Sequence, residues 1–318
     1  MILVLTEIFH QQIKRTSLES LTLAAQLAKV TGSKVKALCI GDGTPAFDLG
    51  DYGADEVLVI SDSAFLENDQ LCDLICRTAT RDNASYVILS LNSTGKSTAG
   101  LVAAKLNKGL ISGVSGMNTN SDNPLFKKNV FSGKASAWYS VDQHGAVLAT
   151  LPNALSPVSG QGKQASITTT NSECTTSKIR RIERRLQAGK TPLAEASVVV
   201  SAGRGMKDPS NWGMIEELSD ILGATTACSR PVADAGWRPH HEHVGQTGLA
   251  IRPNVYVAIG ISGAIQHLAG VNNSRKIIVI NKDPEAPFFK AADYGVCGDL
   301  FEIVPKLNEA LKNFKSKS

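Results

Sequence analysis

Turns rich in glycine follow several strand-like segments in the second half of this chain. Ser201–Gly205 (SAGRG) has the form of a dinucleotide-binding turn, although the third glycine of G-x-G-x-x-G is missing. Val244–Gly248 (VGQTG) is a polar loop, and Gly260–His267 (GISGAIQH) ends a buried segment and opens a predicted helix whose N–H groups would suit a pyrophosphate. Asn281 ends another strand and could reach a ribose hydroxyl. Together these turns favour an extended dinucleotide; the alternative is that they are ordinary turns.

Three other motifs point less clearly to chemistry. Asn92–Thr98 (NSTGKST) imitates the end of a P-loop, but Ser90 stands where that motif needs a glycine, so a plain helix start is the better interpretation. His240–His243 (HHEH) could hold a metal, but no further His or Cys follows closely, so we interpret it as an exposed loop and expect no metal. No G-x-S-x-G elbow supports acyl transfer.

Length and composition narrow the classes of protein further. A chain of 318 residues favours two domains, and its 19% charged and 42% apolar residues are ordinary for a globular protein. The apolar run Val255–Ile265 is too short to cross a membrane, and a net charge of +4 is a weak argument for nucleic acid. The basic run Lys178–Arg185 has no interleaved aromatic residue, so we interpret it as a solvated linker or edge strand and expect no binding of nucleic acid.

The cysteines and the N-terminus bear on the compartment. The six cysteines form no C-x-x-C pair, and most are interpreted as small core residues near strand ends. The first residues, Met1–Glu7, enter an apolar run without the features of a secretory or organellar leader. We therefore expect a cytoplasmic, bacterial protein, or one of the mitochondrial matrix only if a transit peptide has been removed.

The elements that would position these motifs alternate between strand and helix in the first half. A helix between the first two strands should begin at a capping box of Thr16 and Glu19 and end at Gly32, and a second should cover Asn68–Thr80. This rhythm predicts a parallel sheet covered by helices, followed by a stretch of alternating strands. The predicted strands are Ile2–Leu5, Val35–Ile40, Glu56–Ile60, Tyr86–Leu91, Lys134–Val141, Ala146–Leu151 and Ala165–Thr170.

The same rhythm restarts after a polar stretch, so we place a domain boundary near residue 190, giving domains 1–190 and 191–318. Helices are predicted over Ser210–Leu222 and Ser262–Ala269, with a last one from about Pro305. The result would be a doubly wound parallel sheet, which binds ligands at the carboxyl ends of its strands. Its predicted strands are Ser197–Ala202, Ala224–Cys228, Val255–Ile259 and Lys276–Ile280.

Residues 197–318 carry a recognisable set of motifs. They are SAGRG from Ser201, CSRPVADAGW from Cys228, VGQTG from Val244, IGISGAIQHLAG from Ile259, INKDPEAP from Ile280 and ADYG from Ala292. In this order and nearly without gaps, they resemble the α subunits of electron transfer flavoproteins. The N-terminal half is similar in layout and in the FSGKA motif from Phe131, but more weakly.

The resemblance implies an N-terminal α/β domain of the nucleotide-hydrolase type that contacts a β subunit, and a C-terminal FAD-binding domain. The β subunit would carry AMP. Such a heterodimer takes electrons from acyl-CoA dehydrogenases and other flavin dehydrogenases in fatty-acid β-oxidation and passes them to a membrane quinone reductase. It is a redox carrier without substrate turnover of its own. The alternatives are the α subunit of an electron-bifurcating flavoprotein that uses NADH, and a non-redox nucleotide-binding sensor protein.

The resemblance also assigns residues, in the positions that match the family's motifs. Arg230 would lie against the isoalloxazine, Thr247 near N5 and His267 near the N1/O2 edge. Arg230 and His267 could then stabilise the negative charge of the reduced flavin. The sequence departs from the family in the His240–His243 loop and at Ala202. We expect neither to touch the residues to which the family's roles are assigned, called here the carried-over residues. The implied FAD-binding residues are Arg204, Ser229, Arg230, Val244, Gly245, Gln246, Thr247, Ser262, Gly263, Ala264, Ile265, Gln266, His267, Asn281, Asp299 and Leu300.

Overall fold

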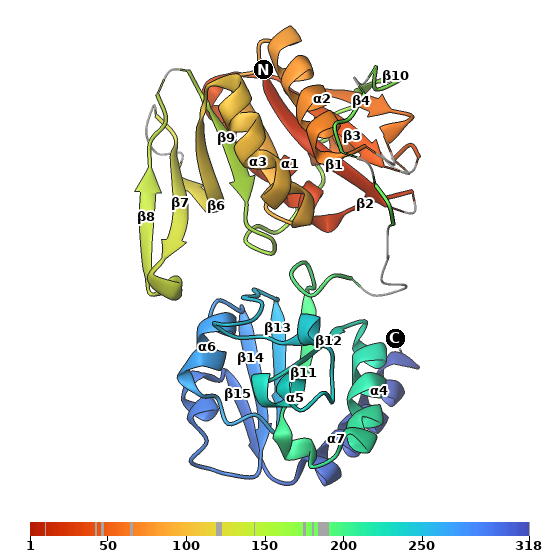
Figure 1. The fold of residues 1–318 in the computed structure, drawn as a ribbon, viewed down its shortest axis with the longest axis vertical. Helices are drawn as coiled ribbons and strands as arrows, with labels where there is room; N and C mark the ends of the chain where they lie inside the picture. Colours follow the sequence, from red (N-terminus) through yellow and green to blue (C-terminus); the bar gives the residue numbers. More distant parts are fainter. Residues whose placement is uncertain are drawn as a thin grey trace. The chain divides into compact units, whose positions relative to one another are not determined.

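The structure is a computed structural model that describes the chain except for residues 10, 42, 46–47, 64–65, 119–122, 143, 174–175, 180, 184–190 and 318. The chain divides into two compact units, Met1–Leu186 and Gln187–Ser318, each with its own sheet (Figure 1). No helix among the described residues is long and apolar enough to cross a membrane.

The N-terminal unit is built on a large mixed sheet. In its described part the strand order is β10-β4-β3-β1-β5-β9-β6-β7-β8, with the short β2 paired to β1. The pairs from β10 to β6 are parallel, whereas β7 pairs antiparallel with both β6 and β8. The strands are β1 (Ile2–Phe9), β2 (Gln12–Ile13), β3 (Val35–Gly41), β4 (Glu56–Ile60), β5 (Tyr86–Ser90), β6 (Gly109–Asn118), β7 (Leu125–Val130), β8 (Ala135–Tyr139), β9 (Ala146–Thr150) and β10 (Ser166–Thr170).

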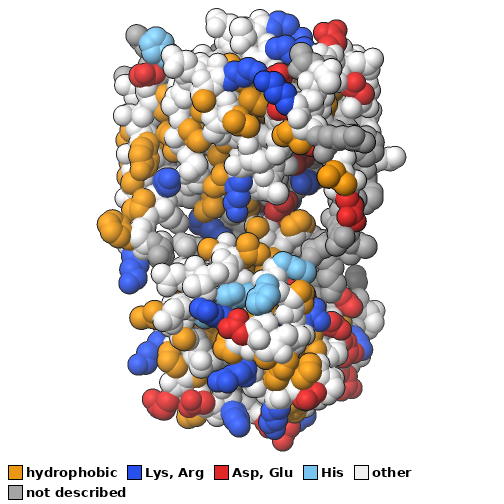
Figure 2. Space-filling model, viewed as in Figure 1, with side chains coloured by type: hydrophobic (Ala, Val, Ile, Leu, Met, Phe, Trp, Pro, Cys, Tyr) orange, Lys and Arg blue, Asp and Glu red, His pale blue; other side chains and the backbone are white. Residues whose placement is uncertain are grey.

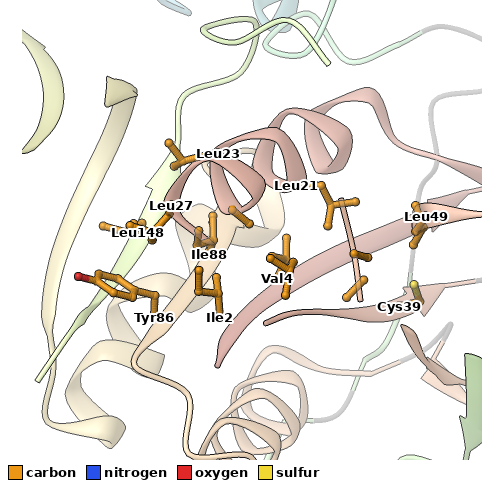
Figure 3. Packing of buried hydrophobic residues seen from close by; sticks show 14 of the residues in the cluster. Ile2, Val4, Leu21, Leu23, Leu27, Cys39, Leu49, Tyr86, Ile88 and Leu148 are labelled. Carbon is orange, nitrogen blue, oxygen red and sulfur yellow. The ribbon is translucent and has the colours of Figure 1, made fainter. Parts of the chain in front are cut away.

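Helices cover both faces of this sheet because its central strands are apolar on both sides. Helix α1 (Arg15–Thr31) packs Leu21, Leu23 and Leu27 on one face, against Ile2 and Val4 (Figure 3). Helices α2 (Asn68–Arg81) and α3 (Ser93–Leu106) cover the opposite face. Strand β1 is buried from Ile2 to Ile8, as expected for a strand between two helical layers.

The predicted capping box of the first helix is wrong. Helix α1 begins one residue before Thr16, after Lys14, and no side chain caps it. The Glu19 carboxylate instead accepts hydrogen bonds from the Arg15 Nε and from the backbone N–H of Asn153. The Glu19 carboxylate, which the local sequence assigns to the helix cap, is therefore used in a tertiary contact instead. The predicted end is confirmed, since Gly32 caps the helix in the left-handed region with φ of 64°.

The P-loop-like segment is a helix start, as interpreted from the sequence. Asn92 caps α3 by accepting a hydrogen bond at Oδ1 from the Gly95 N–H at 3.1 Å. Its Nδ2 donates to the buried carboxylate of Glu7, which also accepts from Thr94 Oγ1 at 2.7 Å and from Lys14 Nζ at 3.1 Å. The polar groups of this segment thus satisfy one another.

The C-terminal unit is a five-stranded sheet in the order β12-β11-β13-β14-β15, and every pair in it is parallel. This confirms the doubly wound sheet. Its strands are β11 (Val198–Ala202), β12 (Thr225–Cys228), β13 (Val255–Ile259), β14 (Lys276–Asn281) and β15 (Tyr294–Cys297). Its helices are α4 (Gly213–Leu222), α5 (Arg230–Asp234), α6 (Ile265–Val271) and α7 (Leu300–Lys315).

Two cores lie on the two faces of this sheet. Val200 and Val257 point to the side of α4, α5 and α7, whereas Val199 and Tyr256 point to the side of α6. The alternation within each strand is the period of two that an extended chain imposes. Burial on both faces explains why these strands read as continuous apolar runs.

Three predicted helix starts in this unit are wrong. Helix α4 begins at Gly213 rather than Ser210, after a 3-10 turn over Pro209–Trp212. Helix α7 begins at Leu300, where Asp299 Oδ1 accepts from the Phe301 N–H at 2.9 Å, and Pro305 lies inside it. The Asp299 cap and the burial of Leu300 and Val304 outweigh the hydrogen bond that the proline cannot donate. Helix α6 begins at Ile265, so Ser262–Ala264 form a loop rather than its first turn.

The cysteines and the basic run can be placed in part. Four cysteines are buried and Cys297 is exposed, while Cys174 lies outside the described residues. Of the run Lys178–Arg185, the described residues lie in no strand; the Lys178 N–H donates to Asp69, and Arg181 pairs with Glu67 at 2.8 Å. Part of that run also lies outside the described residues.

Candidate functional site

Two cavities lie at the carboxyl ends of the C-terminal strands, and we call them together the strand-end groove. The strand order reverses between β11 and β13, which is the position where open α/β sheets bind ligands. The first cavity, about 440 Å³, is lined by residues after β11, β12 and β13 and by α6: Gly203, Arg204, Ser229, Arg230, Pro231, His243, Val244, Gly245, Gln246, Thr247, Gly260, Ile261, Ser262, Ala264, Gln266 and His267.

The second cavity shares Arg204 and Gly260 with the first and extends toward β14 and α7. Its volume is about 550 Å³, and it is lined by Arg204, Gly205, Lys207, Trp237, Gly260, Asn281, Lys282, Asp299, Leu300 and Phe301. Because the two cavities share Arg204 and Gly260, they form one long groove. Figure 2 shows histidine side chains gathered on one face of this unit, beside basic and acidic side chains.

Glycines form the floor where the two cavities meet. A Cβ on Gly203 would lie 2.4 Å from the Gly260 carbonyl oxygen, and one on Gly205 would lie 2.7 Å from the Gly260 Cα. Gly260 itself has φ of +60°, which other residues rarely adopt. Only glycines let these two backbone turns touch, and the contact leaves room above them for a ligand.

The loop Ser262–Ala264 closes one side of the groove. Gly263 has φ of +82° and packs on Phe288, whose N–H donates to the Ser262 carbonyl at 3.1 Å. Because α6 begins only at Ile265, Ser262–Ala264 belong to this glycine-containing loop and not to the helix start that the sequence predicted.

The polar loop Val244–Gly248 is held against α6 by its backbone. The Gln246 N–H donates to the Gln266 carbonyl at 2.7 Å, and the Val244 N–H donates to the Cys228 carbonyl at 3.1 Å. Val244 is buried, while Gln246 and Thr247 are exposed. The loop therefore presents polar side chains from a fixed backbone.

Arg230 places an exposed positive charge in the lining of the first cavity. It is the first residue of α5, its side chain is 63% exposed, and its Nε lies 3.3 Å from Asp234 Oδ2 one turn later. Ser229 precedes it and is buried at the end of β12. The guanidinium can reach a ligand in the groove, with part of its charge balanced by Asp234.

His267 is buried beside two aromatic residues. Its Nε2 lies 2.7 Å from the hydroxyl of Tyr256, and Phe288 packs edge-on against it at 5.7 Å between ring centroids. Burial, with the nearby His243, lowers the pKa of His267 from 6.5 to about 4. The imidazole is therefore neutral at physiological pH.

His243 lies in the first cavity, whereas the sequence reasoning considered it only as a possible metal ligand and placed it in an exposed loop. Its side chain is buried, and a Cβ added at Gly248 would lie 2.8 Å from its Nδ1, so this glycine makes room for the ring. Burial lowers its pKa. The expectation that the His240–His243 loop touches no carried-over residue is thus wrong. The spacing of His243 ahead of VGQTG was the only signal in the sequence.

The rest of that loop is exposed, as expected. His240 and His241 are exposed, and Arg238 pairs with Glu242 at 2.7 Å and with Glu216 at 2.8 Å. Among the described residues, no three His, Cys, Asp or Glu side chains gather as metal ligands would.

The second cavity is basic, and its predicted polar residues are partly engaged. Asn281 Nδ2 donates to the Ile261 carbonyl at 2.9 Å, and its Oδ1 accepts from the Asp283 N–H at 3.1 Å, so its amide already braces two turns. Arg204 is joined by Lys207 and Lys282, neither of which was predicted. A groove with a glycine floor and three cations fits the pyrophosphate of a dinucleotide.

The predicted site residues therefore come together in one unit. All of them line one of the two cavities except Gly263, which packs on Phe288, and Ile265, which is 78% exposed. The main lining residues that the sequence reasoning did not assign to the site are His243, Lys207, Lys282 and Trp237.

Comparison with known proteins gives this arrangement a family. Residues 2–173 match the family model described as the electron transfer flavoprotein domain, and residues 192–272 match the electron transfer flavoprotein FAD-binding domain. The chain belongs to the electron transfer flavoproteins, as an α subunit. The FAD-binding domain match contains every residue of the first cavity, whereas Asn281, Asp299 and Leu300 of the second lie beyond it.

Relatives within the electron transfer flavoprotein family align along most of the chain. The electron transfer flavoprotein subunit alpha of Bacillus subtilis is 33% identical over 100% of this chain and 99% of that protein. The α subunit of Syntrophomonas wolfei is 35% identical over 90% of this chain and 92% of its own length. Protein FixB of Clostridium saccharobutylicum is 33% identical over 93% of this chain and 91% of its own.

Proposed function

We propose that this chain is the FAD-carrying α subunit of a heterodimeric electron transfer flavoprotein. The observation that carries the proposal is that the FAD-binding domain match coincides with the groove at the switch point of the C-terminal sheet. The partner would be a β subunit that carries AMP, and the N-terminal unit is the part that we expect to contact it. One FAD is expected per heterodimer.

The heterodimer would carry electrons from acyl-CoA and other flavin dehydrogenases to a membrane quinone reductase, in fatty-acid β-oxidation, without substrate turnover of its own. When bound, the isoalloxazine would supply the redox chemistry. The chain's own task is to bind and tune. Arg204, Lys207 and Lys282 would neutralise the pyrophosphate, while Arg230, Thr247 and the neutral imidazole of His267 would face the ring.

The first test is whether the chain binds FAD through the groove. Co-purified with its β-type partner, the wild-type chain should be yellow and hold one non-covalent FAD. Arg204→Gln should weaken FAD binding about 10- to 100-fold, because a hydrogen bond to a charged group contributes roughly 1.5–3 kcal/mol. The measurement is a fluorescence titration of the stripped heterodimer with FAD.

Lys276→Gln is the matched control, because Lys276 pairs with Asp293 at the other end of the strands and lines neither cavity. Its FAD affinity should equal that of the wild type. An intact heterodimer that stays colourless and takes up no added FAD would contradict the proposal.

Arg230 should set the flavin's potential more than the affinity for FAD. At an effective dielectric of about 20, a unit charge about 4 Å from the ring is worth ~4 kcal/mol. Exposure of Arg230 and its pairing with Asp234 reduce this to roughly 1–3 kcal/mol, on the order of 40–130 mV for one electron. Arg230→Ala should therefore lower the first reduction potential by that amount in a spectroelectrochemical titration, and Arg230→Lys should recover only part of it.

Asp234→Asn provides the opposite change, since it removes the carboxylate that balances Arg230. Its potential should rise. An unchanged potential in Arg230→Ala, with FAD fully retained, would show that the guanidinium does not act on the ring.

A further inference from the structure

A buried tyrosine hydroxyl contacts the histidine of the groove from behind. Tyr256 lies in the middle of the C-terminal sheet, on β13, and none of its side chain is exposed. Its hydroxyl lies 2.7 Å from Nε2 of His267, a distance typical of a strong hydrogen bond. Sequence reasoning treated Tyr256 only as one residue of a core strand, because nothing local to it indicates this contact.

Phe288 fixes the relative positions of the two rings. It stacks on Tyr256 at 6.2 Å between centroids with 26° between planes, and meets His267 edge-on at 5.7 Å and 67°. Gly263 packs against the backbone and the Cβ of Phe288, and so fixes the base of that side chain. Tyr256 and Phe288 thus contact the imidazole of His267 on the side that faces away from the groove and hold it in place.

The contact decides which ring nitrogen is left for the groove. His267 lines the first cavity, and its Nε2 is directed to Tyr256, so Nδ1 is the nitrogen that remains. Among the described residues, the His267 ring makes no other hydrogen bond. A neutral imidazole carries one proton, and the hydrogen bond at one nitrogen determines whether the other can donate.

Burial keeps both groups neutral at pH 7. Burial raises the pKa of Tyr256, so the phenol keeps its proton and can donate it. Burial lowers the pKa of His267 to about 4, so the imidazole is neutral at pH 7. A phenol that donates to Nε2 leaves the single imidazole proton on Nδ1.

We propose that Tyr256 is a positioning residue that fixes His267 as the Nδ1–H tautomer and so gives the groove a neutral N–H donor instead of a bare acceptor. The role of this donor rests on the proposed function, because the group that it would meet is the flavin ring. A fixed N–H stabilises negative charge that develops on reduction, whereas an unprotonated nitrogen would repel it. The tautomer itself does not depend on FAD.

The test is nitrogen NMR of the full chain labelled with ¹⁵N-histidine, with His267 assigned by the His267→Gln variant. In the wild type at pH 7, the chemical shifts should show Nδ1 protonated and Nε2 unprotonated. In Tyr256→Phe the ratio of the two tautomers should change about fivefold toward Nε2–H, the change that corresponds to a hydrogen bond of ~1 kcal/mol. Tyr294→Phe, which removes an exposed hydroxyl at the sheet edge, should leave the ratio unchanged.

An Nε2–H tautomer in the wild type, or an unchanged ratio in Tyr256→Phe, would overturn the proposal. If Tyr256→Phe does not fold, the wild-type tautomer alone decides. A second measurement compares the affinities of the heterodimer for reduced and for oxidised FAD. The ratio of these affinities should be about fivefold lower in Tyr256→Phe than in the wild type, and an unchanged ratio would refute the role toward the flavin. Failure of the chain to bind FAD would contradict the proposed function and leave the tautomer result standing.

Discussion

Gly263→Ala is expected to lower the free energy of unfolding of the C-terminal unit by about 2–5 kcal/mol. The backbone at Gly263 has φ of +82°, and an added Cβ would lie 2.6 Å from both the backbone nitrogen and the Cβ of Phe288. The left-handed conformation costs a residue with a side chain roughly 1–2 kcal/mol, and overpacking a buried contact costs roughly 1–3 kcal/mol more. Phe288 cannot move away, because it is fully buried and its N–H is bonded to Ser262.

The measurement is urea denaturation in a Trp138→Phe background, so that Trp212 and Trp237 report the C-terminal unit alone. Gly213→Ala is the matched control. Gly213 has φ of −53°, begins α4 and has nothing within 4 Å of an added Cβ. That variant should be as stable as the wild type or gain about 0.4–1 kcal/mol. If the unfolding free energy of Gly263→Ala lies within ~0.5 kcal/mol of the wild-type value, the loop can adopt another backbone conformation of low energy.

The consequence for the groove follows from what Phe288 touches. Tyr256 and His267 both pack on it, so a displaced Phe288 would move the imidazole before it unfolded the sheet. Partial strain at Gly263 should therefore appear as a change at His267. This links the stability of the loop to the chemistry of the groove.

The sequence was most informative about the buried parallel strands. Short β-branched runs flanked by Gly, Asp or Asn, such as Glu56–Ile60 and Val255–Ile259, coincide with β4 and β13 residue for residue. These strands are covered on both faces, so their apolar pattern is continuous and hard to mistake. The strands that were missed lack this continuous apolar pattern, although the exposed β8 and β10 were predicted. β6 contains three glycines at positions 109, 113 and 116, β7 contains Lys127 and Lys128, and β15 is exposed along its length.

Local signals also failed where a tertiary contact outweighed them. Pro305 reads as a helix start but lies inside α7, because Asp299 caps the helix and Leu300 is buried. Thr16 and Glu19 read as a capping box, yet Glu19 turns to Asn153, far away in the sequence. Neither outcome can be read from a window of a few residues.

The residues of the candidate site also fall into those that the sequence reveals and those that it does not. Glycine-bearing strand ends such as Gly203 and Gly260 were visible because tight backbone approach demands that residue type. His243 and Lys207 were not, because each stands next to a motif without belonging to it, and Tyr256 was not, because it meets His267 only through the packing of β13 against α6. The motif residues mark where the groove forms, and the folded structure adds further residues to its lining.

His267 should make the C-terminal unit less stable as the pH falls from about 6.5 to about 4. Its pKa in the folded chain is about 4, against an ordinary value of 6.5. Between these values the unfolded chain binds a proton that the folded chain does not, so acid favours unfolding. The stability is fully present above pH 6.5 and is lost progressively down to pH 4. With 1.36 kcal/mol per unit of pKa, the loss attributable to this one residue is about 3 kcal/mol.

The quantity to measure is the slope of the unfolding free energy against pH, for the wild type and for His267→Gln. Glutamine can still accept a hydrogen bond from Tyr256 but does not titrate, so the variant should lose most of the slope between pH 6.5 and 4. The remaining slope belongs to His243, whose pKa burial also lowers, and to carboxylates such as Glu217 and Asp293, whose pKa values are lowered by their lysine partners. His240→Gln is the control, since His240 is exposed and its replacement should leave the slope unchanged. Equal slopes for wild type and His267→Gln would mean that His267 takes up its proton as readily in the folded chain as in the unfolded one. The imidazole would then not be a buried neutral group, and the proposed hydrogen bond from Tyr256 would lose its basis.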